Sequence, residues 1–279
     1  MAIEAMRAQG YTVDTLILAD STATVLALEQ GDLDFAVISD VSGWLAIEKG
    51  ARLVAVLDDT ADSTVLVARK DVKTCADLQG RRLAIPSLVS TRVALVNWYI
   101  EQHCPGTRPT FLLVAGDTSR LAGLMAGELD AGIMDMESLA RLDSTRREEL
   151  STLVSFGDEI PGLSTTTLFT RRELIDTNPE TVKDWLRALL LARRRLQDPE
   201  VLAAELVTRL EMTPGDAREM AATYLARTYW NVNANFTQET IQRSLDFAIQ
   251  SLGVRPDLKA GDLSDLTALK AVLDEIGRQ

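Results

Sequence analysis

Hydroxyl and carboxylate side chains gather where several expected strands end and the next helix begins. In parallel α/β sheets, ligands bind outside the carboxyl ends of the strands, where helix amino termini present free N–H groups. The candidate ligand-binding residues at such positions are Ser21, Thr22, Ser39, Asp40, Ser87, Ser90, Thr91, Asp135 and Glu137. Side chains of these types hold small polar molecules through hydrogen bonds and charge, so binding is the chemistry that we expect of them.

Each candidate also has an ordinary structural role that the sequence leaves open. Ser90 or Thr91 can cap a helix, which contributes about 1 kcal/mol by itself, and Asp40 can cap a short helix at 41–49. Glu137 can contact the ligand or hold a hinge loop together. Capping and ligand binding are compatible with each other, so both interpretations stand at this point.

The chain lacks the motifs of familiar enzymes and metal sites. GxSxG, HExxH and Walker sequences are absent. His103 adjoins Cys104, but no further ligands gather nearby, whereas structural zinc needs four. With Cys75 as the other cysteine and no CxxC, two free thiols are favoured over one disulfide. We therefore expect no catalytic residue, no metal and no cofactor.

A few charged and aromatic residues have two interpretations. Arg92 and Arg120 are candidate partners for an anion, but each falls inside a predicted helix, where it can also point to solvent. The three arginines at 193–195 are predicted to form a solvated helix face. Trp44 can line a cleft or join the core, and the core is favoured.

Composition and charge are those of a soluble globular protein. Hydrophobic residues make up 46% and charged residues 25%, and 29 Lys and Arg against 41 Asp and Glu give a net charge of −12. No basic stripe with interleaved aromatics is present, so nucleic acid is not an expected partner. No apolar stretch approaches the ~18–20 residues of a membrane span, and MAIEAMRAQG has no apolar core typical of a secretory signal.

A sequence segment that occurs twice in similar form, the repeated phrase of this chain, indicates how the secondary-structure elements are organised. Residues 19–40 (ADSTATVLALEQGDLDFAVISD) and 115–136 (AGDTSRLAGLMAGELDAGIMDM) align without a gap. Each copy predicts a capped helix, a glycine stop, a tight turn and a short apolar strand. The recurring Asp34 and Asp130 fit a turn-stabilising role. Two copies far apart in the chain predict two similar lobes that face each other across a cleft.

The apolar pattern predicts the remaining elements. Strands expected at 15–19, 35–39 and 52–57 alternate with helices, an order that implies parallel strands with crossover connections. Further strands are expected at 64–70, 81–86, 110–115, 152–156 and 164–170. Beyond Thr177 the chain is predicted to be helical, with helix starts at Asn178-Pro179, Asp198-Pro199, Thr213-Pro214 and Thr237.

The lobes are predicted to be joined by two strand crossings, near 60–66 and 160–168. Lobe 1 then comprises residues 1–63 plus 165–279, and lobe 2 comprises residues 64–164. One lobe is therefore expected to be discontinuous in sequence.

Five segments together resemble the solute-binding proteins of ABC importers. They are LEQGDLDFAVISD, AIEKGARLVAVL, LVARKDVKTCADLQGRRLAIP, LMAGELDAGIMDMES and TRRELIDTNPETVKDWLRALLLA. The branch that this chain resembles includes alkanesulfonate, taurine, nitrate and thiamine-precursor binders. The resemblance implies an α/β, two-lobed type II periplasmic-binding fold, each lobe a mainly parallel sheet flanked by helices, with a helical C-terminal region. Family members usually begin with a strand and a ligand-contacting loop before the first helix, whereas this chain is expected to start inside that helix. Either its start is truncated, or it lacks the first strand.

The resemblance also implies a function. It predicts a solute-binding component of an ABC import system, not an enzyme, that closes around a small polar organic ligand between its lobes. An ABC permease of the inner membrane is the implied partner, and a periplasmic or extracytoplasmic monomer is expected. The alternative is a cytoplasmic enzyme or ligand sensor on the same fold, similar to the pyrimidine synthases or the menaquinone-pathway lyases.

The charges of the candidate residues bear on the ligand. Asp40, Asp135 and Glu137 are set against few arginines in the expected cleft. An unpaired carboxylate beside a fixed anion is costly. The sequence therefore favours an amine-bearing or heteroaromatic ligand, such as a thiamine-type pyrimidine, over a sulfonate or nitrate.

Overall fold

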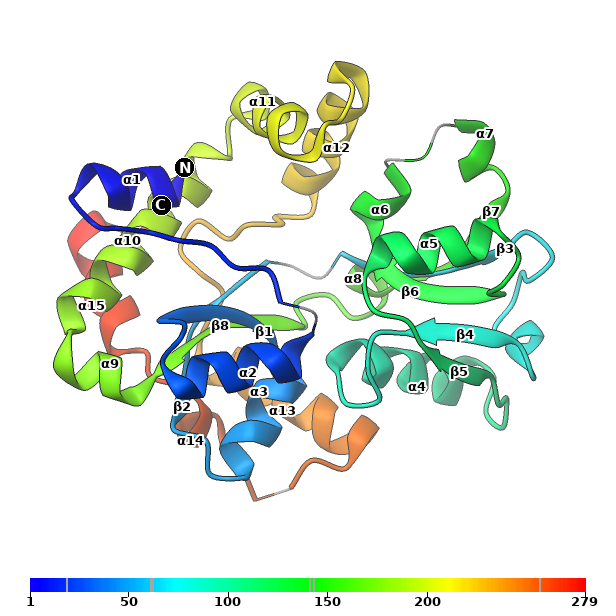
Figure 1. Cartoon of the computed structure of the whole chain (residues 1–279), viewed down its shortest axis with the longest axis horizontal. Coiled ribbons are helices and arrows are strands. Elements are labelled where there is room, and N and C mark those ends of the chain that lie inside the picture. Colours follow the sequence, from blue (N-terminus) through cyan, green and yellow to red (C-terminus); the bar gives the residue numbers. More distant parts are fainter. Residues whose placement is uncertain (19, 61–62, 141, 143, 256) are drawn as a thin grey trace.

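Two sheets, each flanked by helices, form the two lobes of the protein (Figure 1). The computed structural model describes residues 1–279 except 19, 61–62, 141, 143 and 256. No helix in the described part of the chain is long and apolar enough to cross a bilayer. The α/β, two-lobed prediction is confirmed.

The smaller sheet has three strands in the order β1-β8-β2, namely β1 (Phe35–Ser39), β8 (Thr166–Arg171) and β2 (Leu53–Asp58). Strand β8 is antiparallel to both neighbours. The predicted mainly parallel sheet is therefore wrong for this lobe: β1 and β2 run in the same direction, but β8 separates them. The middle of β8 is buried and contains β-branched and aromatic residues, which suits a central strand.

The strand expected at 15–19 does not form in the described residues. Residues 11–18 have no regular structure, and residue 19 lies outside the described part of the chain. The side chain of Ile17 is 97% exposed. An apolar run becomes a strand only where a neighbouring strand pairs with its backbone, and β1 has no partner other than β8 among the described strands.

The larger sheet is mixed and has the order β5-β4-β6-β3-β7. Its strands are β3 (Thr64–Arg69), β4 (Arg82–Ile85), β5 (Thr110–Leu113), β6 (Ala131–Asp135) and β7 (Leu150–Ser155). Strand β4 is parallel to β5 and β6, whereas β3 is antiparallel to β6 and β7. The carboxyl ends of β4 and β6 therefore lie at the same edge of the sheet.

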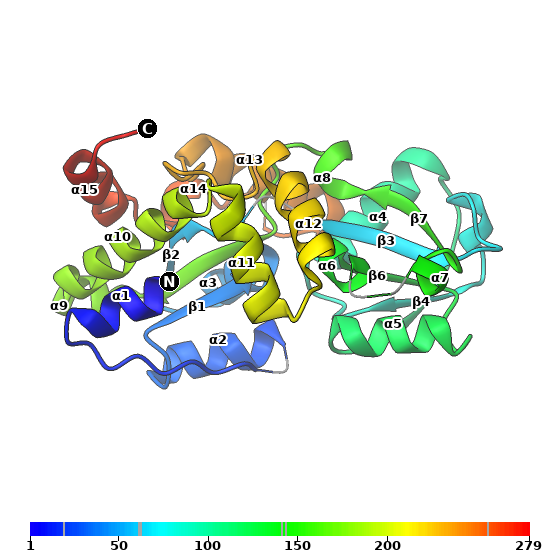
Figure 2. The same ribbon diagram turned by 90° about the horizontal axis from the view of Figure 1, so that it is seen from above.

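Helices cover the sheets and extend the smaller lobe (Figures 1 and 2). Those before residue 165 are α1 (Ala2–Ala8), α2 (Ser21–Gln30), α3 (Asp40–Glu48), the 3-10 turn η1 (Ala76–Leu78), α4 (Thr91–His103), α5 (Asp117–Met125), α6 (Met136–Ala140), α7 (Ser144–Arg147) and α8 (Phe156–Glu159). Those after it are α9 (Arg172–Thr177), α10 (Pro179–Arg195), α11 (Pro199–Leu210), α12 (Pro214–Ala226), α13 (Gln238–Leu252), α14 (Ala260–Leu263) and α15 (Thr267–Ile276).

The repeated phrase forms the predicted unit twice. The first copy contains α2 and β1, with Gly31 at φ 84° as the left-handed helix stop, and the second contains α5 and β6, with Gly127 at φ 74°. A left-handed residue of this kind favours glycine, because other side chains are strained there. Both helix–turn–strand predictions are confirmed.

Packing corrects two predictions and confirms a third. Trp44 is buried in the core around the smaller sheet, as expected. Arg193 is only 6% exposed, so the solvated arginine face predicted at 193–195 is wrong at this position. Cys75 and Cys104 form a disulfide, which overturns the preference for free thiols. Packing of α4 on the larger sheet brings their Cα atoms to 5.8 Å, a distance suited to a disulfide.

Candidate ligand-binding site

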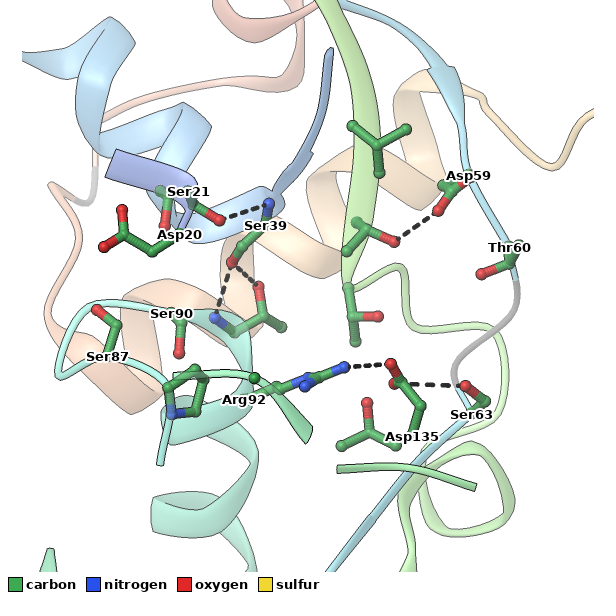
Figure 3. Close-up of a pocket in the computed structure, with 18 of the residues that line it drawn as sticks. Asp20, Ser21, Ser39, Asp59, Thr60, Ser63, Ser87, Ser90, Arg92 and Asp135 are labelled. Atoms are coloured by element: carbon green, nitrogen blue, oxygen red, sulfur yellow. Dashed lines mark hydrogen bonds and ion pairs between the residues drawn. The ribbon is translucent and has the colours of Figure 1, made fainter. Parts of the chain in front are cut away.

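A pocket of about 320 Å³ is lined by residues from both lobes (Figure 3). Seven of the nine candidate residues line it: Ser21, Thr22, Ser39, Ser87, Ser90, Thr91 and Asp135. The two candidates that do not are Asp40 and Glu137. The structure thus brings most of the candidates together, and their contact with a ligand stays a prediction.

Residues of β1 and α2 form one wall of the pocket. Asp20 caps α2, because its carboxylate accepts hydrogen bonds from the backbone N–H groups of Thr22 (2.8 Å) and Ala23 (2.9 Å). The cap of α2 is therefore Asp20, not the adjacent candidates Ser21 and Thr22. The hydroxyl of Ser21 instead accepts a hydrogen bond from the Ser39 backbone N–H, at 3.4 Å.

Hydrogen bonds join this wall to the loop before α4. The Thr91 N–H donates to Ser39 Oγ at 3.0 Å, and the hydroxyls of Ser39 and Thr91 are 3.1 Å apart. The Ser42 hydroxyl donates to the Val89 carbonyl at 3.0 Å. Ser90 accepts from Val93 N–H and is the cap of α4. The lobes therefore already touch at this edge of the pocket, through groups that could also serve a ligand.

Arg92 reaches the pocket from α4 and pairs with two carboxylates. Its Nη1 is 2.8 Å from Asp117 Oδ1. Its Nη2 is 2.6 Å from Asp135 Oδ2, a pair that Figure 3 shows. Burial disfavours the charged form of Arg92, but Asp135 and Asp117 outweigh this effect and raise its pKa. Burial likewise opposes ionisation of Asp117, yet Arg92 and the Asp135 N–H keep the pKa of Asp117 below its usual value. Arg92 thus faces the pocket rather than bulk solvent, with its charge already neutralised.

Asp59 adds a further carboxylate to the lining besides Asp20 and Asp135, on the crossing that follows β2. Its Oδ2 accepts a hydrogen bond from the Thr166 hydroxyl at 3.3 Å. Burial raises the pKa of Asp59, and Arg193 limits the rise. A buried carboxylate with a raised pKa is stabilised by a cationic ligand group beside it.

Asp40 is buried rather than presented to the pocket. The residue is 2% exposed, and no hydrogen bond of normal geometry reaches its carboxylate within the described part of the chain. Burial raises its pKa to about 7, although the nearby hydroxyls of Thr167 and Ser164 oppose the rise. The first residue of α3 turns its side chain toward these hydroxyls near β8, which is why Asp40 is absent from the pocket lining.

Glu137 lies behind the pocket lining. Its carboxylate accepts hydrogen bonds from the hydroxyls of Tyr224, Tyr229 (3.2 Å) and Ser63 (3.4 Å). Burial raises the pKa of Glu137, and the Tyr224 hydrogen bond lowers it in part. Tyr229 and Ser63 themselves line the pocket. Glu137 therefore contacts lining residues but does not line the pocket itself, and its role stays a prediction.

Several lining residues were missed from the sequence. Asp59, Thr60 and Ser63 belong to a polar stretch that directly follows a strand, and the rule used for the other candidates would have found them. Tyr229 follows α12, far along the chain, and carries no local signal of a site. Among the described residues, no group of His, Cys, Asp and Glu is arranged to hold a metal ion.

A polar pocket at the junction of two α/β lobes is the arrangement expected of a solute-binding protein. The sequence profile of the phosphonate-binding, periplasmic substrate-binding proteins of ABC transporters matches residues 4–212. This chain belongs to that family.

Solved structures share the fold. The ligand-binding component of an ABC-type import system from Staphylococcus aureus has a TM-score of 0.78 and 15% identity, covering 94% of this chain and 88% of that one. The nitrate-binding protein from Synechocystis PCC 6803 has a TM-score of 0.75 and 12% identity, with coverages of 99% and 85%. The alkanesulfonate-binding protein from Xanthomonas axonopodis pv. citri, bound to MOPS, has a TM-score of 0.67 and 17% identity, with coverages of 93% and 89%.

Curated relatives match a shorter stretch. A binding protein of Brucella abortus is 31% identical over 77 residues, which are 28% of this chain. The match spans 24% of the length of that relative.

Proposed function

We propose that this chain is the solute-binding component of an ABC importer and has no enzymatic activity. The observation that carries the proposal is the pocket between the lobes. Both lobes contribute to its lining, and the described lining residues include hydroxyls, carboxylates and the arginine Arg92. Such a lining holds a solute through hydrogen bonds and charge. Family membership supports an extracytoplasmic location and a membrane permease as partner. We also propose that the chain acts as a monomer and does not bind nucleic acid.

The proposed lobes are residues 1–63 plus 165–279 and residues 64–164, with hinge crossings near 60–66 and 160–168. Because the pocket is lined from both lobes, a bound solute contacts both at once. A solute that makes more contacts in the closed arrangement than in an open one shifts the population toward closure. The closed form is then the form presented to the permease.

The proposed ligand is a small polar organic molecule that carries an amine, with or without an anionic group. Asp20, Asp59 and Asp135 line the pocket, whereas Arg92 is the cation among its described lining residues. Arg92 already pairs with Asp117 and Asp135. Asp59 can accept an amine, while the amino terminus of α4 can hold an anion. An aminoalkylphosphonate combines both groups.

Thermal unfolding with a matched solute panel tests this proposal. The panel contains 2-aminoethylphosphonate, ethylphosphonate, ethylamine and thiamine, and native mass spectrometry of freshly purified protein is run beside it. A solute at 100 times its Kd stabilises the folded state by about 2.7 kcal/mol. We expect an amine-bearing solute to raise Tm most, and Asp59→Asn to reduce that preference while the exposed Asp32→Asn does not. No Tm shift with any solute and no co-purified molecule would refute the proposal.

A further inference from the structure

The helical hairpin formed by α11 and α12 has its own small core and reaches the second lobe. It follows α10, which belongs to the smaller-sheet lobe, and lies between the two lobes in both views (Figures 1 and 2). Leu202, Leu206 and Met220 pack inside the hairpin, and Met136 of the second lobe packs against the same cluster. The hairpin is therefore attached to one lobe by the chain and to the other by contacts.

Two tyrosines and a carboxylate form the polar part of this attachment. The hydroxyls of Tyr224, on α12, and Tyr229, on the connector after it, donate to the same oxygen of Glu137, at the start of α6. The two tyrosine rings stack with centroids 4.3 Å apart. Arg227 adds an ion pair with Asp158 at 2.8 Å. Tyr224 and Glu137 are largely shielded from water, where a hydrogen bond to a carboxylate is strong.

The connector after α12 is also tied to the first lobe. Asn235 N–H donates to Asp58 Oδ2 at 3.0 Å, and Arg193 Nη1 reaches the Asn231 carbonyl at 3.5 Å. Residues 229–235 therefore bond to the end of β2 on one side and, through Tyr229, to Ser63 and Glu137 on the other. This connector links the lobes beside the crossing that runs from β2 to β3.

We propose that Glu137 is a positioning residue: it holds Tyr229 in the pocket wall and, through Tyr224, fastens the α11–α12 hairpin to the second lobe. Together the three side chains restrain the lobes in the arrangement of this structure. Tyr229 lines the pocket and Tyr224 does not. A solute that hydrogen-bonds Tyr229 or Ser63 therefore acts on the same carboxylate that holds the hairpin. The restraint itself does not depend on which solute binds.

Hydrogen exchange and small-angle X-ray scattering of the solute-free protein test the inference without a ligand. The variants are Tyr224→Phe, Tyr229→Phe and Glu137→Gln. Tyr11→Phe is the matched control. The hydroxyl of Tyr11 donates to the Asp184 carboxylate at a distance of 2.7 Å, and neither residue lines the pocket. Loss of a hydrogen bond to a charged acceptor should make exchange in α12 on the order of ten times faster.

A local structural role and a restraint on the lobes give different results. We expect both tyrosine variants to speed exchange at 214–226 and to raise the radius of gyration, whereas Tyr11→Phe changes neither. The effects of Tyr224→Phe and Glu137→Gln on exchange in α12 should add up to less in the double variant than the sum of the two single effects, because Tyr224→Phe already removes the hydroxyl that donates to residue 137. Wild-type exchange in α12 and a wild-type radius of gyration in Tyr224→Phe would overturn the inference, as would strictly additive effects in the double variant.

Discussion

Replacing Arg193 with methionine should strongly destabilise the protein. Arg193 projects from α10 to the end of β2, where Nη1 is 2.9 Å from Asp58 Oδ1 and Nη2 is 2.6 Å from the Asp59 carbonyl. A further hydrogen bond from Nη2 reaches the Asp58 carbonyl. Methionine keeps the length and helix propensity of the side chain but leaves a buried carboxylate and two carbonyls without this donor.

The size of the effect follows from burial. Arg193 and Asp58 are 6% and 8% exposed, so neither group recovers full hydration when its partner is removed. Breaking a buried ion pair by removing one partner costs about 3–5 kcal/mol. With a urea m-value of about 3 kcal/mol per M, the unfolding midpoint should fall by about 1–1.7 M. Asp59 follows Asp58 directly, so solute affinity should fall as well.

Urea unfolding followed by tryptophan emission and far-UV circular dichroism measures this change. Arg187→Met is the control, because Arg187 lies on the same helix and pairs with Glu275 at the surface. Surface ion pairs contribute little to stability, so its midpoint should stay near that of the wild type. If Arg193→Met shifted the midpoint no more than Arg187→Met, the reasoning from burial would be refuted.

Two further predictions concern stability. The disulfide joins cysteines 29 residues apart, and the entropy of closing a loop of that length corresponds to about 3–4 kcal/mol. The double variant Cys75→Ser/Cys104→Ser should therefore lower the free energy of unfolding by that amount. An unchanged urea midpoint would contradict this prediction. Burial raises the pKa of Asp40 to about 7, so the folded state binds a proton more tightly than the unfolded state, and this residue reduces stability as pH rises from about 4 to about 7. Asp40→Asn should remove that decline in the unfolding free energy measured against pH, and a pH profile parallel to that of the wild type would argue against it.

Local signals in the sequence were sufficient to predict where α10, α11, α12 and α13 begin. Pro199 and Pro214 each occupy a first helical position, and the preceding Asp198 and Thr213 accept hydrogen bonds from the backbone of the first turn. Cap and proline together specify a helix start within about four residues. No information from elsewhere in the chain was needed.

Strand pairing was less predictable, because it depends on segments that are distant in sequence. Phe35 pairs with Thr170, and the apolar pattern of either strand is the same whether its neighbour is parallel or antiparallel. The residues of the pocket likewise fall into those that local sequence signals predicted and those that they did not. Ser87 and Asp135 follow strands, so the rule for carboxyl ends found them, whereas Tyr229 reaches the pocket through a connector between two helices.

The central position of β8 constrains the order in which the two sheets can form. Strands β1 and β2 have no direct pairing with each other, because each pairs with Thr166–Arg171. The smaller sheet therefore cannot assemble without β8, more than one hundred residues beyond β2 in the chain, whereas the five described strands of the larger sheet lie between residues 64 and 155. Pairing across so long a separation is slow, so we expect the larger sheet to form first and β1 and β2 to stay unpaired until β8 joins them.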